Sequence, residues 1–199
     1  VMAVREGIGT DQRIGMSFLY PGIGFGGSCF PKDVRALSRV GAENHVEIEI
    51  LNAVTHVNER QKLVLGQRLI DHFGGTLTNR RIGVWGLAFK ANTDDIREAT
   101  ALVLINQLLQ AGASICAYDP EAMKNGARFF AGQERVSFAA GPYGAAEEAD
   151  ALVLCTEWGV FRNPNFAMLK NLLKTPLLFD GRNQYDPERM QKLGFTYFS

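Results

Sequence analysis

The sequence predicts an α/β protein in which a helical central segment is followed by a Rossmann-like domain with a parallel sheet. Residues 1–73 show the apolar spacing of helices, broken by one glycine-rich loop. After Gly74 and Gly75, short runs of continuously apolar residues alternate with helical patterns. Such runs are typical of strands in a parallel sheet that helices cover on both faces. We therefore expect a helical region over 1–75 and a Rossmann-like domain over 76–199.

The helical region is predicted to contain a loop between helices and one long helix. Residues 20–29 are too rich in glycine for a helix interior. A helix should start directly after them, because Pro31 suits the first helical position and Asp33 the first turn. The long helix is predicted from about 44 to 73, where apolar residues recur at spacings of three and four: Ile50, Val54, Val57, Leu65, Leu69 and Phe73. A helix of this length often joins domains or pairs subunits.

The strands of the second domain are predicted from four apolar runs, at residues 81–86, 114–118, 150–155 and 176–179. A weaker run at 135–138 is predicted to be an edge strand, and a helix is expected over 98–111. Open α/β sheets bind ligands beyond the carboxyl ends of their strands. Several polar and charged residues follow these ends, among them Lys90, Asp119, Glu157, Arg182 and Asn183.

Three cations near these strand ends are candidates for binding a diphosphate: Lys90, Arg97 and Arg182. Taken singly, each has the alternative of being an ordinary loop charge. The segment 83–86 does not have the G-x-G-x-x-G pattern of a dinucleotide loop. We therefore do not expect this domain to be the main cofactor domain.

The composition of the chain limits the classes of partner that it is expected to bind. The chain has 21 basic and 21 acidic residues, and this balance argues against a broad nucleic-acid or membrane surface while allowing a local phosphate site. The start of the chain lacks the pattern of a signal peptide and an initiator methionine, so we expect a piece of a longer protein. Three widely spaced cysteines without a C-x-x-C pair favour a reducing cytoplasm, and the histidine spacing predicts no metal site.

The segment 25–33 is the candidate reactive site. Its glycines allow close approach of a ligand and offer amide donors. Cys29 lies at the expected helix start, where the helix dipole and nearby Lys32 both favour a thiolate. Asp33 is suited to accept or relay a proton, or simply to cap the helix. We predict that Cys29 is an activated nucleophile, the alternative being an inert thiol, and that Cys116 and Cys155 belong to the core.

Six segments together resemble the UDP-glucose/GDP-mannose dehydrogenase family, in the family's order along the whole chain: 11–15, 18–19, 24–33, 86–90, 94–98 and 179–183. The resemblance implies an NAD-dependent oxidoreductase acting on a nucleotide sugar. The Phe-Pro pair after Cys29 and the Asp-Gln-Arg-Ile-Gly run at 11–15 favour UDP-glucose, while GDP-mannose and UDP-N-acetyl sugars stay open.

The same resemblance implies a role for particular residues. Cys29 matches the family's catalytic nucleophile and Asp33 an assisting aspartate. Cys29 and Lys32 are implied to border the nicotinamide, and Arg97 to contact the cofactor. Substrate contacts are implied for Arg13 (in the family from a neighbouring subunit), Tyr20, Pro21, Gly22, Ile23, Gly24, Phe25, Gly26, Phe89, Lys90 and Arg182. The long helix is implied to form a homodimer interface.

The implied chemistry is two successive oxidations of UDP-glucose to UDP-glucuronate through a thiohemiacetal and a thioester on Cys29. The family's amino-terminal NAD domain lies outside these residues, so the isolated chain is expected to be inactive. A different class of function stays open, namely a non-catalytic nucleotide-binding or assembly module.

Overall fold

The sheet of the second domain is fully parallel and has the strand order of a Rossmann fold. A computed structural model describes residues 1–17 and 19–199; Phe18, one of the residues that carry the resemblance, lies outside the described residues. The six strands lie in the order β3-β2-β1-β4-β5-β6, and all neighbouring pairs are parallel. Their bounds are β1 Arg81–Trp85, β2 Ser114–Tyr118, β3 Val136–Phe138, β4 Ala151–Leu154, β5 Leu177–Asp180 and β6 Thr196–Phe198. The predicted fold class is confirmed.

The strand register brings the carboxyl ends together. Trp85 of β1 pairs with Tyr118 of β2 and with Leu154 of β4, and Leu154 pairs with Asp180 of β5. The polar residues that follow these strands therefore meet at one edge of the sheet. The predicted edge strand at 135–138 is present as β3, whereas β6 and most of the shorter helices were not predicted.

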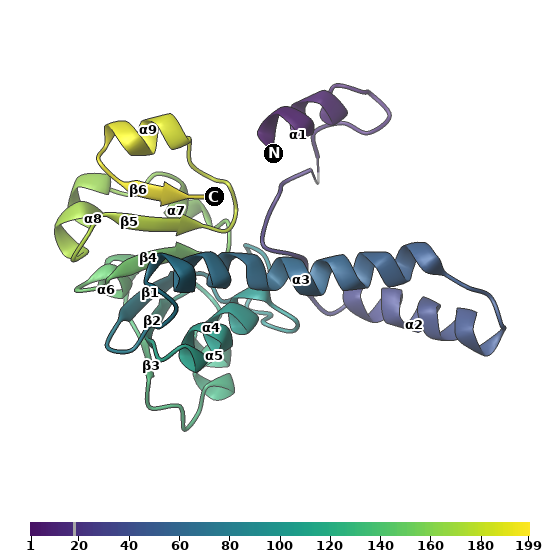
Figure 1. Cartoon of the computed structure of the whole chain (residues 1–199), viewed down its shortest axis with the longest axis horizontal. Coiled ribbons are helices and arrows are strands. Elements are labelled where there is room, and N and C mark those ends of the chain that lie inside the picture. The colour runs from purple at the N-terminus through teal and green to yellow at the C-terminus, as the bar shows by residue number, and fades with distance from the viewer. Residues whose placement is uncertain (18) are drawn as a thin grey trace.

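The helices are α1 Met2–Gly9, α2 Phe30–Glu43, α3 Glu49–His72, α4 Thr100–Gln110, α5 Met123–Phe129, α6 Pro142–Ala146, α7 Gly159–Arg162, α8 Phe166–Leu172 and α9 Pro187–Lys192. In Figure 1, α2 and α3 form an antiparallel pair that extends away from the sheet, and the carboxyl-terminal part of α3 lies over the Rossmann-like domain. Among the described residues, the structure has no helix that is both long and apolar enough to cross a bilayer.

The predicted start of the long helix at about residue 44 is wrong, because a turn separates α2 from α3. Asn44 ends α2, and its side-chain amide donates to the Val40 carbonyl at 2.8 Å. His45 has a φ of 58°, and the Val46 amide returns to the Gly41 carbonyl at 2.9 Å, a common way of closing a helix end. The next helix begins at Glu49, and its apolar residues recur at helical spacings from Ile50 on, so a pattern of spacings alone does not reveal this break.

The core is built around two aromatic stacks. Trp85 of β1 lies on Phe161 of α7 with ring centroids 4.7 Å apart, and Phe179 of β5 stacks on Phe198 of β6 at the same separation. Trp85, Phe161 and Phe179 have no exposed surface. Their burial holds the sheet and its covering helices in one rigid unit that carries the site at its edge.

Candidate active site

A buried carboxylate organises the loop that follows β1. Asp119, which directly follows β2, is 0% exposed. Its Oδ2 accepts from the Leu87 amide at 2.7 Å, the Ala88 amide at 3.0 Å and Trp158 Nε1 at 3.0 Å. In dinucleotide-binding folds the loop after the first strand offers its amides to a pyrophosphate. Here a carboxylate of the chain itself takes two of them, which supports the expectation that this domain is not the main NAD site.

A second buried carboxylate, Asp180, holds the loop after β5. It accepts from the Arg182 amide at 2.8 Å, the Gln184 amide at 2.7 Å and the Tyr197 hydroxyl at 2.7 Å. Burial, and next the charge of Asp180, raise the pKa of Tyr197, so its hydroxyl stays a donor. This loop therefore presents Arg182 from a fixed backbone.

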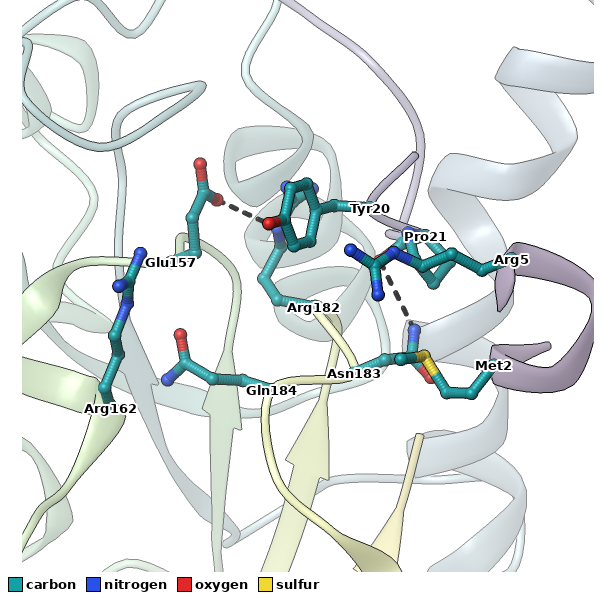
Figure 2. Close-up of a pocket in the computed structure, with 9 residues that line it drawn as sticks. All are labelled: Met2, Arg5, Tyr20, Pro21, Glu157, Arg162, Arg182, Asn183 and Gln184. Carbon is teal, nitrogen blue, oxygen red and sulfur yellow. Dashed lines mark hydrogen bonds and ion pairs between the residues drawn. The ribbon is translucent and has the colours of Figure 1, made fainter. Parts of the chain in front are cut away.

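A cavity of about 480 Å³ opens at this edge of the sheet, between α1 and the loops after β4 and β5. Figure 2 shows the residues that line it: Met2, Arg5, Tyr20, Pro21, Glu157, Arg162, Arg182, Asn183 and Gln184. Three of them are arginines and one is a carboxylate, so the lining is cationic. Arg182 Nε lies 2.9 Å from Glu157 Oε2, and the Arg5 guanidinium lies 4.5 Å from the centre of the Tyr20 ring. The cavity has the charge and size for an anion such as a diphosphate.

The first half of the glycine-rich loop is held between this cavity and α3. The Ile23 amide donates to the Gly181 carbonyl at 3.1 Å, and Gln61 of α3 donates to the Gly22 carbonyl at 3.0 Å. Asn58 of α3 accepts from the Phe25 amide at 2.8 Å and donates to the Phe25 carbonyl at 3.1 Å. A side chain on Gly22 would meet the Arg182 guanidinium, so the loop backbone lies directly against this cation.

The second half of the loop leads to Cys29 along the segment that precedes α4. The Gly27 amide donates to the Arg97 carbonyl at 2.9 Å. Gly27 has a φ of 95°, and a side chain on it would meet the Phe89 ring. Cys29 then caps the start of α2 and is exposed. The pKa of Arg97 is raised, mainly by its hydrogen bonds with Asp95.

The structure distinguishes the three cysteines by environment. Cys29 is exposed at the amino terminus of a 14-residue helix, with Pro31 in its first turn as predicted. Cys116 and Cys155 are buried in the sheet region, and burial raises the pKa of the Cys155 thiol to about 12. Cys29 therefore offers an accessible thiol, while the other two pack as apolar side chains.

The sequence-predicted residues fall into three groups. Tyr20, Pro21 and Arg182 meet in the cavity, and Phe89 and Arg97 lie beside the cysteine-bearing half of the loop. Lys90, Lys32 and Asp33 are exposed; Lys90 Nζ lies 5.3 Å from the Phe89 ring centre, and Lys32 Nζ lies 3.5 Å from Asp33 Oδ1.

Arg13 is not brought to the cavity. Its side chain is 88% exposed and pairs with Asp11 at 2.6 Å. Its assignment to a neighbouring subunit's site stays a prediction.

Sequence reasoning missed Arg5 and Arg162 in the cavity lining, and it missed Asn58 and Gln61, which hold the loop. Arg5 and Arg162 lie in short helical segments with no local motif. Of these residues, Asn58 did carry a signal. Positions 58, 62, 65 and 69 lie on one face of the helix at spacings of three and four, and Asn58 and Lys62 are polar where the pattern expects apolar residues.

Fold and site together define a class of protein: a Rossmann-like α/β protein in which a cationic cavity and a cysteine-bearing glycine loop share one edge of the sheet. Models of the UDP-glucose/GDP-mannose dehydrogenase family match the chain twice, as the UDP binding domain over residues 83–187 and as the central domain over residues 1–60. The chain belongs to this family.

Individual relatives agree with the family. The chain is 48% identical over 197 residues to UDP-glucose 6-dehydrogenase of Pseudomonas aeruginosa, covering 98% of this chain and 44% of the relative. It is 43% identical over its full length to UDP-glucose 6-dehydrogenase of Rhizobium meliloti, covering 45% of that protein. A UDP-glucose dehydrogenase structure from Pyrobaculum islandicum is similar at a TM-score of 0.85 and 31% identity, over 99% of this chain and 42% of the other. The chain thus spans less than half the length of these relatives.

Proposed function

We propose that this chain supplies the nucleophilic cysteine and the UDP-sugar-binding half of an NAD-dependent UDP-glucose 6-dehydrogenase. One observation carries the proposal: a single ten-residue loop lines the cationic cavity at Tyr20 and ends at the exposed Cys29. A nucleotide anchored in the cavity would thereby direct its sugar along the loop towards the thiol.

Binding of the nucleotide is assigned to the cavity. Arg182 and Arg162 suit the diphosphate, because guanidinium groups form charge-assisted hydrogen bonds with phosphate oxygens. Glu157 holds Arg182 in place through the 2.9 Å contact. The rigid backbone after β5 and the glycine loop leave little to reorganise when the ligand binds.

NAD is expected to bind mainly outside these residues, since Asp119 already takes the amides of Leu87 and Ala88. Residues at the rim do suit part of a cofactor. The Arg97 side chain is 71% exposed beside the cysteine segment, and Lys32 follows Cys29 by three residues. NAD, when bound, would accept a hydride from C6 of the sugar in each of two successive steps.

The chemistry assigned to Cys29 balances over these two steps. The C6 alcohol first loses a hydride and a proton and becomes an aldehyde. Cys29 Sγ then adds to C6, forming a C–S bond and a thiohemiacetal. Loss of the second hydride and the hydroxyl proton gives a thioester, and water replaces sulfur to give the carboxylate and return the thiol. Loop amides are suited to stabilise the oxygen that becomes negative, which typically contributes several kcal/mol.

The test is Cys29→Ser in the full-length protein that contains this chain, with Cys116→Ala as the matched control. We expect Cys29→Ser to abolish formation of UDP-glucuronate and Cys116→Ala to retain it. Iodoacetamide should label Cys29 well before Cys116 and Cys155. Equal and slow labelling of all three, with an active Cys29→Ser protein, would favour a non-catalytic nucleotide-binding module instead.

UDP-glucose is the preferred substrate because relatives of 43–48% identity carry that name, whereas a GDP-mannose dehydrogenase structure from Pseudomonas aeruginosa is 26% identical at a TM-score of 0.69. A panel of UDP-glucose, GDP-mannose and UDP-N-acetyl sugars decides between them. Turnover of GDP-mannose without UDP-glucose would overturn the choice.

The proposal includes a homodimer formed through α2 and α3, in the cytoplasm. Apolar side chains on these helices are unusually exposed for a surface of an isolated chain, including Ile50 at 79%, Leu37 at 53% and Val57 at 52%. Apolar surface of this kind marks protein interfaces. Analytical ultracentrifugation gives the oligomeric state directly.

A further inference from the structure

Lys62, in the middle of α3, carries a buried ammonium group that the chemistry above does not use. Its side chain is only 3% exposed. Lysines are almost never fully buried unless they are paired. Its Nζ lies 2.8 Å from Glu59 Oε1 of the same helix and 3.8 Å from Glu98 Oε2, which belongs to the segment before α4.

Glu98 also pairs with a second cation, which belongs to a different helix. Arg35 of α2 donates to Glu98 Oε1 at 3.1 Å, so each oxygen of this carboxylate faces a cation from a different helix. The space among these groups measures about 20 Å³, which holds about one water molecule. The cluster of Arg35, Lys62 and Glu98 is therefore a packed contact between segments and not a ligand pocket.

The backbone of Glu98 also contacts the loop that carries the cysteine. A side chain on Gly26 would collide with the Glu98 carbonyl, and the neighbouring Gly27 amide donates to the Arg97 carbonyl at 2.9 Å. Glu98 has a φ of 54°, a conformation that costs energy for a residue other than glycine and that often marks functional sites. One residue thus touches the glycine loop with its backbone, and α2 and α3 with its carboxylate.

We propose that Glu98 is a positioning residue that fixes Cys29 relative to the nucleotide-binding edge, by joining Arg35, Lys62 and the glycine loop. The inference rests on the proposed function, because it concerns how Cys29 is held in position for that reaction. If Cys29 shifts relative to C6, the aldehyde formed in the first oxidation has time to leave before sulfur adds to it.

The experiment compares Glu98→Gln with Glu59→Gln in the full-length protein. Both variants remove one carboxylate near Lys62, but only Glu98 links α2 and α3 to the loop. We expect Glu98→Gln to lower kcat about 10-fold, to leave KM for UDP-glucose within about 2-fold, and to release free aldehyde that a hydrazine reagent traps. The rate of iodoacetamide labelling of Cys29 should change by about 3-fold, because the position and the accessibility of the thiol change. Glu59→Gln should resemble the wild type in all four measurements.

Glu98→Asn provides a second variant that tolerates the positive φ and is therefore expected to fold. A merely structural role would lower the amount of active enzyme without changing the ratio of aldehyde to acid. Unchanged aldehyde release and labelling in both Glu98 variants would overturn the inference, as would an equal effect of Glu59→Gln. A wild-type protein that does not oxidise UDP-glucose would instead overturn the proposed function. The labelling rates would still test whether Glu98 positions Cys29.

Discussion

The Rossmann-like domain and the helical region differ in where they place their large apolar side chains. Trp85 and Phe179 in the domain have no exposed surface, whereas Ile50 and Leu37 on the helical pair α2–α3 are 79% and 53% exposed. The domain therefore buries its large apolar side chains in one core, to which Leu65 and Leu69 of the carboxyl-terminal half of α3 also belong. The helical pair leaves an apolar face that, on the proposed function, a second subunit covers.

The same contrast holds for reactive and polar groups. The carboxylates of the domain, Asp119 and Asp180, are 0% and 1% exposed and accept several hydrogen bonds each. Cys29, where the glycine loop meets α2, is exposed. A rigid, internally satisfied scaffold that presents its chemistry on a loop is a common way to build a site.

The largest expected effect tests whether the free energy of unfolding depends mainly on the buried core and little on the exposed apolar face of α2 and α3. Phe161→Ala should lower the free energy of unfolding by about 3–5 kcal/mol, because it removes a fully buried ring stacked on Trp85. Leu37→Ala, on the exposed helical face, should change it by less than about 0.5 kcal/mol in the monomer. Urea unfolding measures both. Similar losses in the two variants would show that the contrast between the regions is false.

The next effect concerns the apolar face of α3. Ile50→Asp should weaken the proposed dimer at least about 30-fold, because dimerisation would bury a charge without a partner. Stability of the monomer should hardly change, since Ile50 contributes little to the core. Sedimentation over a range of concentrations measures the dissociation constant, with Lys192→Asp on the outer helix α9 as a control. A dimer that survives Ile50→Asp would place the interface elsewhere.

A smaller effect is expected at the cavity. Arg162→Ala should weaken UDP binding about 3- to 10-fold and reduce its salt dependence, since one cation near the phosphates is lost. Arg128→Ala, an exposed arginine of the same domain outside the cavity, is the matched control. Calorimetry with this chain measures UDP affinity, and the same instrument should find NAD binding very weak. Tight NAD binding would contradict the role given to Asp119.

The smallest effect is a pH dependence of the domain. The raised pKa of Tyr197 means that the folded protein keeps the phenol protonated where the unfolded chain, with an ordinary value of 10.0, releases the proton. Its contribution to stability is therefore complete below about pH 10 and is lost as pH rises above that value. Tyr197→Phe should show a smaller loss of stability between about pH 9 and pH 11. An unchanged dependence of stability on pH would mean that other groups determine the loss of stability in this pH range.

The sequence predicted the sheet better than the helical region, and the reason is physical. The strands β1, β2, β4 and β5 are apolar on both faces, so their pattern is independent of distant contacts. The end of α2 depends instead on Asn44 and on the left-handed conformation of His45, which a spacing pattern does not reveal. Strand β6 is only three residues long and gains its place by pairing with β5.

The candidate site was predictable where it depended on local motifs. Cys29 at a helix start, and Arg182 after a strand, were both evident from neighbouring residues. Arg5, Arg162 and Glu98 were not given site roles from the chain alone, because their importance arises from contacts between segments far apart in sequence. Glu98 and Lys62, for example, are 36 residues apart and meet only because α3 crosses the segment before α4.

The internal bonding of Asp119 has a consequence for inhibitor chemistry. Compounds that imitate a dinucleotide gain much of their affinity from free backbone amides, and at this domain two of those amides are already bonded to a carboxylate. A selective compound would instead have to match the spacing of arginine side chains around the cavity. Such a compound would discriminate this domain from ordinary Rossmann folds by side chains alone, so resistance would arise through single arginine substitutions.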